Sequence, residues 1–215
     1  MRARSRILFA SILLGAALGC ASQAPPASAP EATSQPPATQ VPSAAGDPVF
    51  LDDFTQLRTQ YGERDDFRAV CEDDRPLHGM IDAANASHWQ DALDVALPWL
   101  AHCAVDIDAR VVAAMSLSGL GREREADDQK RWVHGLMDSI LDSGDGETKE
   151  TAFVVISLPE EYSFLRSFGL AVKQQTLLDN RIDALVVEDE SGRSTTVYFD
   201  PAAHFRRLGR ELGEK

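Results

Sequence analysis

The residues best suited to acid–base or metal chemistry gather in one acidic stretch, SILDSGDGETKETAFVVISLPEEYSFL, which runs from Ser139 to Leu165. In chain order they are Asp142, Asp145, Glu147, Glu160, Glu161 and Tyr162. Two carboxyl groups can act as acid and base when their surroundings separate their pKa values. Carboxylates in a glycine-containing loop can also supply the oxygen ligands that a calcium-like ion takes. The stretch therefore raises two hypotheses, a hydrolase site and a cation site.

The loop over residues 142–148 does not follow the known cation and phosphate patterns. When Gly146 is placed at the invariant glycine of an EF-hand, Leu141 falls at the first ligand position and Ala152 at the twelfth. A phosphate loop needs Gly-Lys-Ser/Thr after the glycines, and the chain has none here. We interpret the loop as a connector in which Gly144 adopts the left-handed conformation that ends a helix. A weak cation site at Asp142, Asp145 and Glu147 stays the alternative.

The carboxylates after the loop also have a structural interpretation. Ser157 and Glu160 have the S-x-x-E spacing of a capping box, so we expect Glu160 and Glu161 to be solvated at a helix start. The hydrolase hypothesis would instead join Glu160, Glu161 and Tyr162 to the loop acids. The sequence contains no H-E-x-x-H, G-x-S-x-G or S-x-x-K motif. We assign no catalytic residue, metal or cofactor.

The segments SGDG, ETAFVVIS, EEY and VYFD, with DALVV, carry a family resemblance. Between about Phe54 and Asp200 the chain resembles the domain of unknown function 4919 family. The resemblance implies a helical N-terminal portion joined to a small α+β portion, in proteins that are often exported. It implies no activity, cofactor or catalytic residue, and it favours shared architecture for the SGDG loop and the EEY helix.

The first residues, MRARSRILFASILLGAALGC, indicate export. Three arginines precede an apolar run from Ile7 to Leu18, which is shorter than the ~20 residues that cross a bilayer. The run ends at Cys20, as in a bacterial lipoprotein signal, although Ala17 departs from the usual Leu, Val or Ile. We expect residues 1–19 to be the signal and Cys20 to carry the lipid, palmitate included. Ala21 in place of Asp favours the outer membrane.

Residues 20–47 and the net charge limit the kind of partner. Pro, Ala, Ser, Thr and Gln dominate residues 21–47, which predicts a disordered tether. Removal of the three signal arginines leaves 18 basic and 34 acidic residues, so the formal charge falls from −13 to −16. Such a charge argues against nucleic acid, whose binding needs phosphate neutralisation. The membrane contact would come from the lipid on Cys20.

Cys71 and Cys103 are the remaining cysteines. An exported protein is in a compartment where disulfides form, and a loop of about 30 residues would stabilise it by on the order of 3 kcal/mol. Two buried free thiols are the alternative.

Apolar periodicity predicts helices in the first half of the folded part, residues 48–143. The expected helices span residues 47–61, 75–86, 89–101, 108–120 and 122–141, and Pro98 should kink or shorten the third. Ala92 and Ala126 are 34 positions apart, which is the tetratricopeptide period. The full consensus is missing, so helical hairpins of that kind and an ordinary small bundle remain equal interpretations.

The second half, residues 144–215, predicts an α+β arrangement. We expect a buried strand over residues 152–156, a helix that follows Ser157 and ends at Gly169, and a closing helix over residues 201–212. Strands are expected over residues 172–178, 182–187 and 195–199. The fold class is α+β, with helical hairpins followed by a small, mostly antiparallel sheet, and residues 48–215 are expected to form one domain.

Together these observations predict a lipid-anchored protein of the bacterial cell envelope, facing the periplasm or the surface. We expect a non-enzymatic module that binds another envelope protein or peptide through its helical hairpins or its sheet edge. The alternatives are an envelope hydrolase or weak cation-binding protein with a site around residues 142–162, and a periplasmic spacer without a specific ligand.

Overall fold

The structure is a computed structural model, and it describes residues 51–179 and 181–213. The predicted signal, the lipidation site at Cys20 and the tether lie outside the described residues. The elements in chain order are α1 (Leu51–Gly62), α2 (Phe67–Cys71), α3 (Leu77–Asn85), α4 (Trp89–His102), α5 (Ile107–Gly119), α6 (Glu123–Leu141), the 3-10 turn η1 (Lys149–Thr151), β1 (Phe153–Val154), α7 (Leu158–Ser167), β2 (Ala171–Leu177), β3 (Asp183–Glu188), β4 (Ser194–Asp200) and α8 (Ala202–Glu211).

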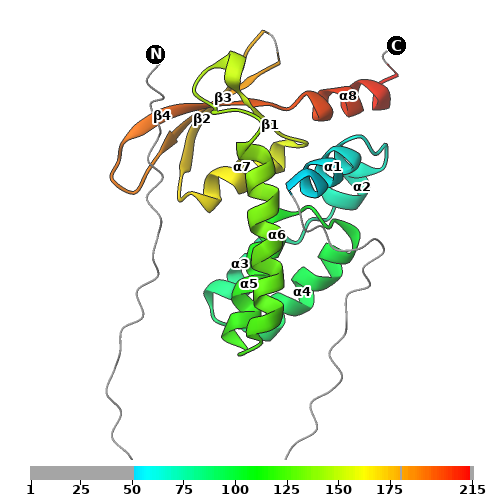
Figure 1. The fold of residues 1–215 in the computed structure, drawn as a ribbon, viewed down its shortest axis with the longest axis vertical. Helices are drawn as coiled ribbons and strands as arrows, with labels where there is room; N and C mark the ends of the chain where they lie inside the picture. Colours follow the sequence, from blue (N-terminus) through cyan, green and yellow to red (C-terminus); the bar gives the residue numbers. More distant parts are fainter. Residues whose placement is uncertain (1–50, 180, 214–215) are drawn as a thin grey trace, which may run out of the picture. The chain divides into compact units, whose positions relative to one another are not determined.

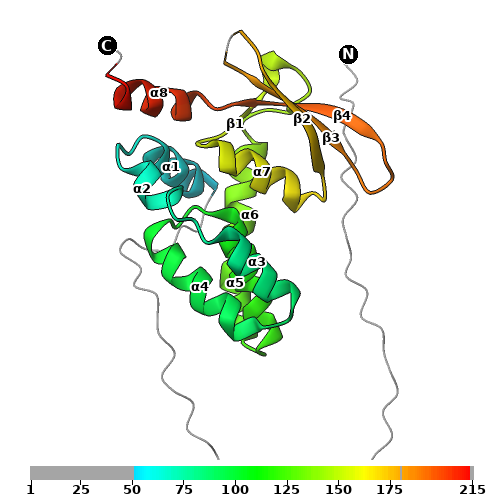
Figure 2. The ribbon, with the colours of Figure 1, turned by 180° about the vertical axis from the view of Figure 1, so that it is seen from behind.

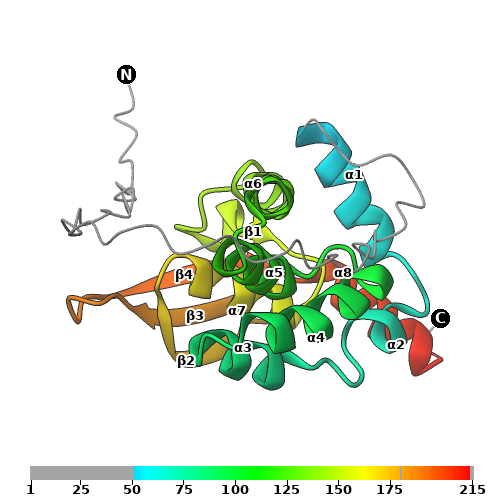
Figure 3. The same cartoon turned by 90° about the horizontal axis from the view of Figure 1, so that it is seen from below.

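Helices α3 to α6 form a layer in which each helix packs on the next, with short loops between them. Figure 3 views α6 nearly end-on and shows α5 beside it. The buried side chains of this layer, which we call the helical core, are Met80, Ala84, Ala92, Leu93, Ala96, Leu100, Ala109, Val112, Ala113, Leu117 and Ala126. More than half of them are alanines, which let helix backbones approach closely. The apolar repeat that predicted these helices therefore comes from the side chains that face this core.

Two details of the helical half differ from the prediction. Pro98 lies inside α4, which continues to His102, so the proline does not shorten the helix. Packing of the buried face of α4, which includes Leu93 and Leu100, holds the helix across the proline. The short helix α2 was not predicted, because five residues are too few to show a helical period. Phe67 and Cys71 are its buried residues.

The second half is a mixed four-stranded sheet in the order β1-β4-β3-β2, as Figure 1 shows above the helices. β4 pairs antiparallel with β3, and β3 pairs antiparallel with β2, while β1 runs parallel to β4. The α+β class is therefore confirmed. The predicted strand over residues 152–156 is wrong in length: the ladder of β1 covers only Phe153 and Val154. Val155 and Ile156 are still buried, because the chain turns there into α7.

A second apolar cluster lies where the sheet and α7 meet α1, α2, α5 and α6. The buried members of this seam core are Phe54, Phe67, Cys71, Cys103, Val105, Ile107, Trp132, Leu136, Met137, Ile140, Phe153, Val155, Ile156, Phe164, Leu165, Leu185, Val187 and Phe199. The rings of Phe153, Phe164 and Phe199 lie 5.0 to 5.9 Å apart between centroids. In Figure 2, α7 lies between the sheet and the helices, so its side chains have to fit both.

The last helix, α8, returns to the start of the domain. The Arg207 guanidinium donates to the backbone carbonyls of Ile156 and Gly62 and lies 4.0 Å from the centre of the Phe67 ring. Arg206 and Arg210 form exposed ion pairs with Glu63 and Asp65. The arginines of this helix are therefore divided between one buried side chain, Arg207, and two that form surface ion pairs.

Candidate functional site

The acidic loop that opens the second half is fixed by its own side chains. One carboxylate oxygen of Asp145 accepts hydrogen bonds from the backbone N–H of Glu147, at 2.9 Å, and from the Thr151 hydroxyl. The backbone N–H groups of Asp145 and Gly146 both donate to the Thr151 carbonyl. These bonds hold the pKa of the exposed Asp145 carboxyl below its usual value, with the Thr151 bond as the largest cause. The Asp145 carboxylate is thus used in shaping the loop.

The two glycines of this loop have different tasks, and that of Gly144 differs from the prediction. Gly146 has the left-handed φ of 65°, and a Cβ there would lie 2.4 Å from the Phe153 ring. Gly144 is not in the left-handed region, so its predicted role is wrong. A Cβ on Gly144 would lie 2.5 Å from the Thr151 carbonyl oxygen, so this glycine is needed for close approach of two backbone segments. Asp142 and Glu147 are exposed.

Glu160 is buried, which contradicts the prediction of a solvated capping carboxylate. The Ser157 hydroxyl does accept from the Glu160 N–H at 3.2 Å, so the serine half of the predicted capping box is present. The Glu160 carboxylate instead binds the Arg58 guanidinium through two bonds, of 2.9 and 3.0 Å, and accepts from the Ile156 N–H at 2.8 Å. Both side chains are about 5% exposed. Arg58 also donates to Ser139 and to the Val154 carbonyl, so this ion pair joins α1, α6, β1 and α7.

Glu161 is fully buried and lacks the cation that Glu160 has. Neither carboxyl oxygen of Glu161 has a hydrogen-bond partner at ordinary geometry among the described residues. Burial raises the pKa of this carboxyl to about 9, and the negative charges of Asp183 and Glu160 add to the effect. Asp183, at the start of β3, is itself only 3% exposed. At neutral pH the pair Glu161–Asp183 therefore holds a proton on Glu161.

A chain of hydrogen bonds leads from this carboxyl pair to the outer strand. The Gln175 side chain donates to the Asp183 carboxylate at 2.9 Å and accepts from the Tyr162 hydroxyl. Burial, followed by the charges of Glu161 and Asp183, raises the pKa of Tyr162. The structure thus brings Glu161 and Tyr162 into one network with Asp183, which the sequence prediction missed. The sequence offered one signal that Asp183 is buried: the alternation of β3 turns Asp183 to the same face as Leu185 and Val187.

A second buried polar cluster, also missed, lies at the start of α5. Arg75 binds Asp106 through bonds of 2.7 Å and reaches Asp108 at 2.9 Å. Asp108 also accepts hydrogen bonds from Arg166 and Ser163 of α7. Burial opposes ionisation of this carboxyl, but those hydrogen bonds, followed by the charges of Arg166 and Arg75, hold its pKa below the usual value. Since both acids are fully paired with arginines, the cluster joins the two halves and leaves no carboxylate free for acid–base work.

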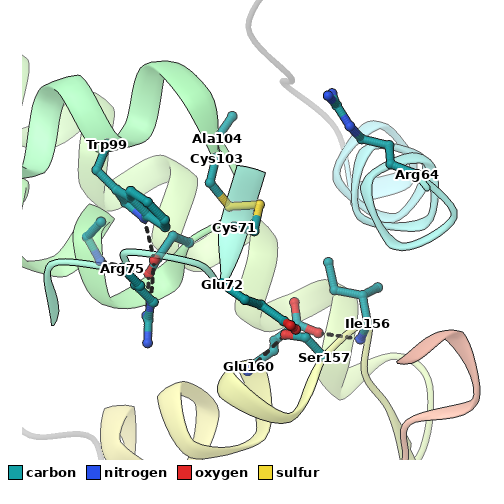
Figure 4. Close-up of a disulfide and its surroundings, with 12 residues drawn as sticks. Arg64, Cys71, Glu72, Arg75, Trp99, Cys103, Ala104, Ile156, Ser157 and Glu160 are labelled. Atoms are coloured by element: carbon teal, nitrogen blue, oxygen red, sulfur yellow. Dashed lines mark hydrogen bonds and ion pairs between the residues drawn. A yellow bond between two sulfur atoms is a disulfide. The ribbon is translucent and has the colours of Figure 1, made fainter. Parts of the chain in front are cut away.

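A disulfide joins Cys71 at the end of α2 to Cys103 after α4. Figure 4 shows it beside Glu72, whose side chain points toward Ser157 and Glu160 of α7. A cavity of about 20 Å³, lined in part by both cysteines, Arg75, Asp106 and Glu160, lies next to the bond. That volume holds about one water molecule, so it cannot admit a substrate.

A wider, open groove of about 460 Å³ lies along α6 beside α1. It is lined by Phe54, Asp127, Lys130, Arg131, His134, Gly135 and Asp138. Its lysine and carboxylates are exposed to solvent, and Lys130 lies 2.9 Å from Asp127. The hydrogen bond to Asp127 raises the pKa of Lys130, so the ammonium group stays charged and is not poised to act as a base.

The outer strand β2 is the most exposed element of the sheet. It pairs with β3 on one side, and all of its residues except Val172 are exposed. Its pairing with β3 shifts register between Val172 and Gln174, so Lys173 lies in a bulge. Because a strand pairs on two sides, β2 presents a row of backbone groups that no described strand covers.

The structure therefore separates the predicted site residues. Asp142, Asp145 and Glu147 belong to the surface loop, whereas Glu160 and Glu161 are buried in the first turn of α7, where Glu160 binds Arg58 and Glu161 lies near Asp183. Among the described residues, no group of three or more His, Cys, Asp or Glu side chains is arranged to hold a metal ion. No described helix combines the length and the apolar character that a bilayer crossing requires.

Comparison with known proteins gives one match. The family model described as a domain of unknown function, DUF4919, matches residues 51–206. No curated protein matches the chain, and no solved structure matches it.

Proposed function

For a chain that belongs to the DUF4919 family, we propose the function of a lipid-anchored binding module of the bacterial cell envelope. The lipid on Cys20 would hold it to the outer membrane, and residues 21–47 would space the folded part from the bilayer. The folded part would bind another envelope protein or peptide, and it would not be an enzyme.

The exposed edge of β2 is the observation that carries this proposal. An edge strand with free backbone groups can accept a further strand, and the added main-chain hydrogen bonds supply affinity. The central residues Gln174, Gln175 and Thr176 are exposed and uncharged. The one charge on the strand, Lys173, lies 2.9 Å from Glu188 of β3. The edge is therefore polar enough to be exposed to solvent, and it carries no net charge that would repel an added strand.

The acids of the second half favour a structural role over catalysis. The pKa of Glu161 is raised, as the acid of an acid–base pair needs, but Glu161 and the neighbouring Asp183 are 0% and 3% exposed. A substrate cannot touch groups that are closed off in this way. The runner-up function is a hydrolase or cation-binding protein acting around residues 142–162. A hydrolase that uses Glu161 would require α7 to move away from β3, whereas the cation site would lie at the exposed acids Asp142, Asp145 and Glu147.

The anchor has its own test. Cells that express the full chain are given labelled palmitate, and the membranes are separated from soluble protein. We expect the wild-type chain to carry the label and to sediment with outer membranes, and we expect Cys20→Ser to lose both properties. An unlabelled wild-type chain in the soluble fraction would contradict the anchor.

The binding edge is tested with a photo-reactive amino acid placed at Gln174 or Thr176 of the full chain in its own membrane. Matched control positions are Ser191 and Glu125, which are equally exposed but distant from β2 in the chain. We expect discrete adducts from the two β2 positions and none from the controls. Adducts of equal yield from all four positions, or none from β2, would rule out the edge as the binding surface.

A further inference from the structure

The side chains of β2 are complementary to themselves. If two copies of the strand pair antiparallel about Gln175, Gln174 of one copy faces Thr176 of the other, and Lys173 faces Leu177. Residues that face one another across an antiparallel pair are the main source of side-chain stabilisation in sheets. In this register no like charges face each other.

The same register covers an exposed apolar side chain. Leu177 is 54% exposed, the largest exposed fraction among the large apolar residues of the sheet. The aliphatic stem of Lys173 from the other copy would lie over it, while the ammonium group keeps its contact with Glu188. Lysines and bulges usually protect sheet edges from pairing. Here the lysine is neutralised, and the bulge at Lys173 leaves the residues from Gln174 to Leu177 in regular register.

Charge argues for the position of the contact. The chain has a formal charge of −13, so two copies repel each other over most of their surfaces. Between Gln174 and Leu177 the edge carries no charged side chain, and the repulsion from distant charges is screened within about 8 Å at physiological salt. At the β2 edge, therefore, two acidic copies can approach each other without placing like charges side by side.

From these observations we propose that the partner at the β2 edge is a second copy of this chain, paired antiparallel through β2 so that the two sheets become continuous. The proposal rests on the proposed function, because it assigns the partner of the same binding edge. Two copies anchored in one membrane would also meet at a raised effective concentration.

The test uses a charge exchange on the exposed outer positions of β2. One variant carries Gln174→Lys and Thr176→Lys, and the other carries Gln174→Glu and Thr176→Glu. In the proposed register each variant places like charges opposite each other twice, whereas a mixture of the two places opposite charges there. A matched control, Ser191→Lys with Ser194→Lys, adds the same charge at exposed positions in and beside the β3–β4 turn.

The measurement is Förster transfer between donor-labelled and acceptor-labelled full chains on lipid vesicles, repeated in solution with Cys20→Ser. We expect transfer for the wild type and for the control, a loss to background for each β2 variant alone, and recovery in their mixture. Circular dichroism of each variant checks that the fold is kept. Absence of wild-type transfer in both settings, or a mixture that stays at background, would overturn self-pairing.

The two proposals fail in different ways. If photo-adducts from β2 join a different protein while the purified chain shows no transfer, self-pairing is wrong and the binding function stands. If β2 gives no adduct on membranes and the wild type shows no transfer, both proposals are wrong. Transfer that is insensitive to the β2 variants would place self-association elsewhere and would also overturn this inference.

Discussion

The helical core and the seam core are built from different interactions. The helical core consists of alanines with a few larger apolar side chains, and its contacts join helices that are neighbours in sequence. The seam core is rich in aromatic rings, and two arginine–carboxylate clusters border it. Those clusters join residues far apart in the chain, such as Arg58 and Glu160, which are 102 positions apart.

The difference shows how the two halves of the domain are held together. Apolar contacts are not directional, so the position of each helix in a core of small apolar side chains depends on packing alone. A buried arginine that binds a carboxylate through two bonds has a single satisfactory geometry. We infer that the ionic clusters fix the position of α7 against the helices, while the aromatic rings supply most of the apolar burial. Substitutions that unpair one partner should therefore affect the seam core more than the helical core.

The largest effect is expected from Arg58→Met. The substitution leaves the Glu160 carboxylate buried without its cation, which typically costs about 3–5 kcal/mol of unfolding free energy. Urea denaturation at neutral pH measures the loss. Arg64→Met is the matched control, because Arg64 pairs with Asp66 at the surface, and its cost should stay within about 1 kcal/mol. Arg58→Met combined with Glu160→Gln should recover part of the loss, and a double variant no better than the single one would weaken the account.

A smaller loss is expected from Ala113→Leu in the helical core. Ala113 is 0% exposed, and a leucine there would force neighbouring helices apart at a cost of about 1–3 kcal/mol. Ala101→Leu on the exposed side of α4 is the control and should change the unfolding free energy very little. Equal effects at the two positions would mean that α4 and α5 do not pack as tightly as described.

Glu161→Gln tests the carboxyl pair through pH. The pKa of Glu161 is raised from 4.5 to about 9, so the folded state binds a proton that the unfolded state has released. The stability that this proton contributes is complete below about pH 4.5 and falls as the pH rises, levelling off above about 9. Over that interval the wild type should therefore lose the stability that this group contributes. The variant, followed by denaturation between pH 5 and 9, should show a flatter profile, and an unchanged slope would contradict the protonated pair.

The smallest effect is expected from Asp145→Ala in the surface loop. The variant loses the exposed bonds to Thr151 and to the Glu147 N–H, so the unfolding free energy should fall by about 1 kcal/mol or less. We expect calcium, magnesium, manganese and zinc to leave the melting temperature of the wild type unchanged relative to a chelator. A saturable rise that Asp145→Ala abolishes would instead support the cation site, because a ligand specific for the folded state raises the melting temperature.

The sequence predicted the parts of the fold that depend on local patterns. The helices around Leu93 and Leu136 were predicted because their apolar side chains recur every three to four residues. The strands predicted over residues 172–178, 182–187 and 195–199 lie within one residue of the observed bounds of β2, β3 and β4. The seam clusters were missed, because nothing near Arg58 or Asp108 in sequence indicates a partner that folding brings from α7. Glu160 was wrongly predicted to be solvated. The capping-box spacing depends only on residues near Glu160 in the chain, and it gives no sign of Arg58, which folding brings to the carboxylate.

The disulfide between Cys71 and Cys103 has a mechanical consequence. A pull on the N-terminal end enters the described domain at α1, and tension along the chain reaches Cys71 before it reaches α3 or α4. The sulfur–sulfur bond then carries that tension directly to Cys103, so the 32-residue segment that contains α3 and α4 is bypassed. Stretching the oxidised protein should therefore release roughly 100 Å less chain than stretching the reduced protein. In the oxidised protein, the disulfide therefore keeps a pulling force from unfolding α3 and α4.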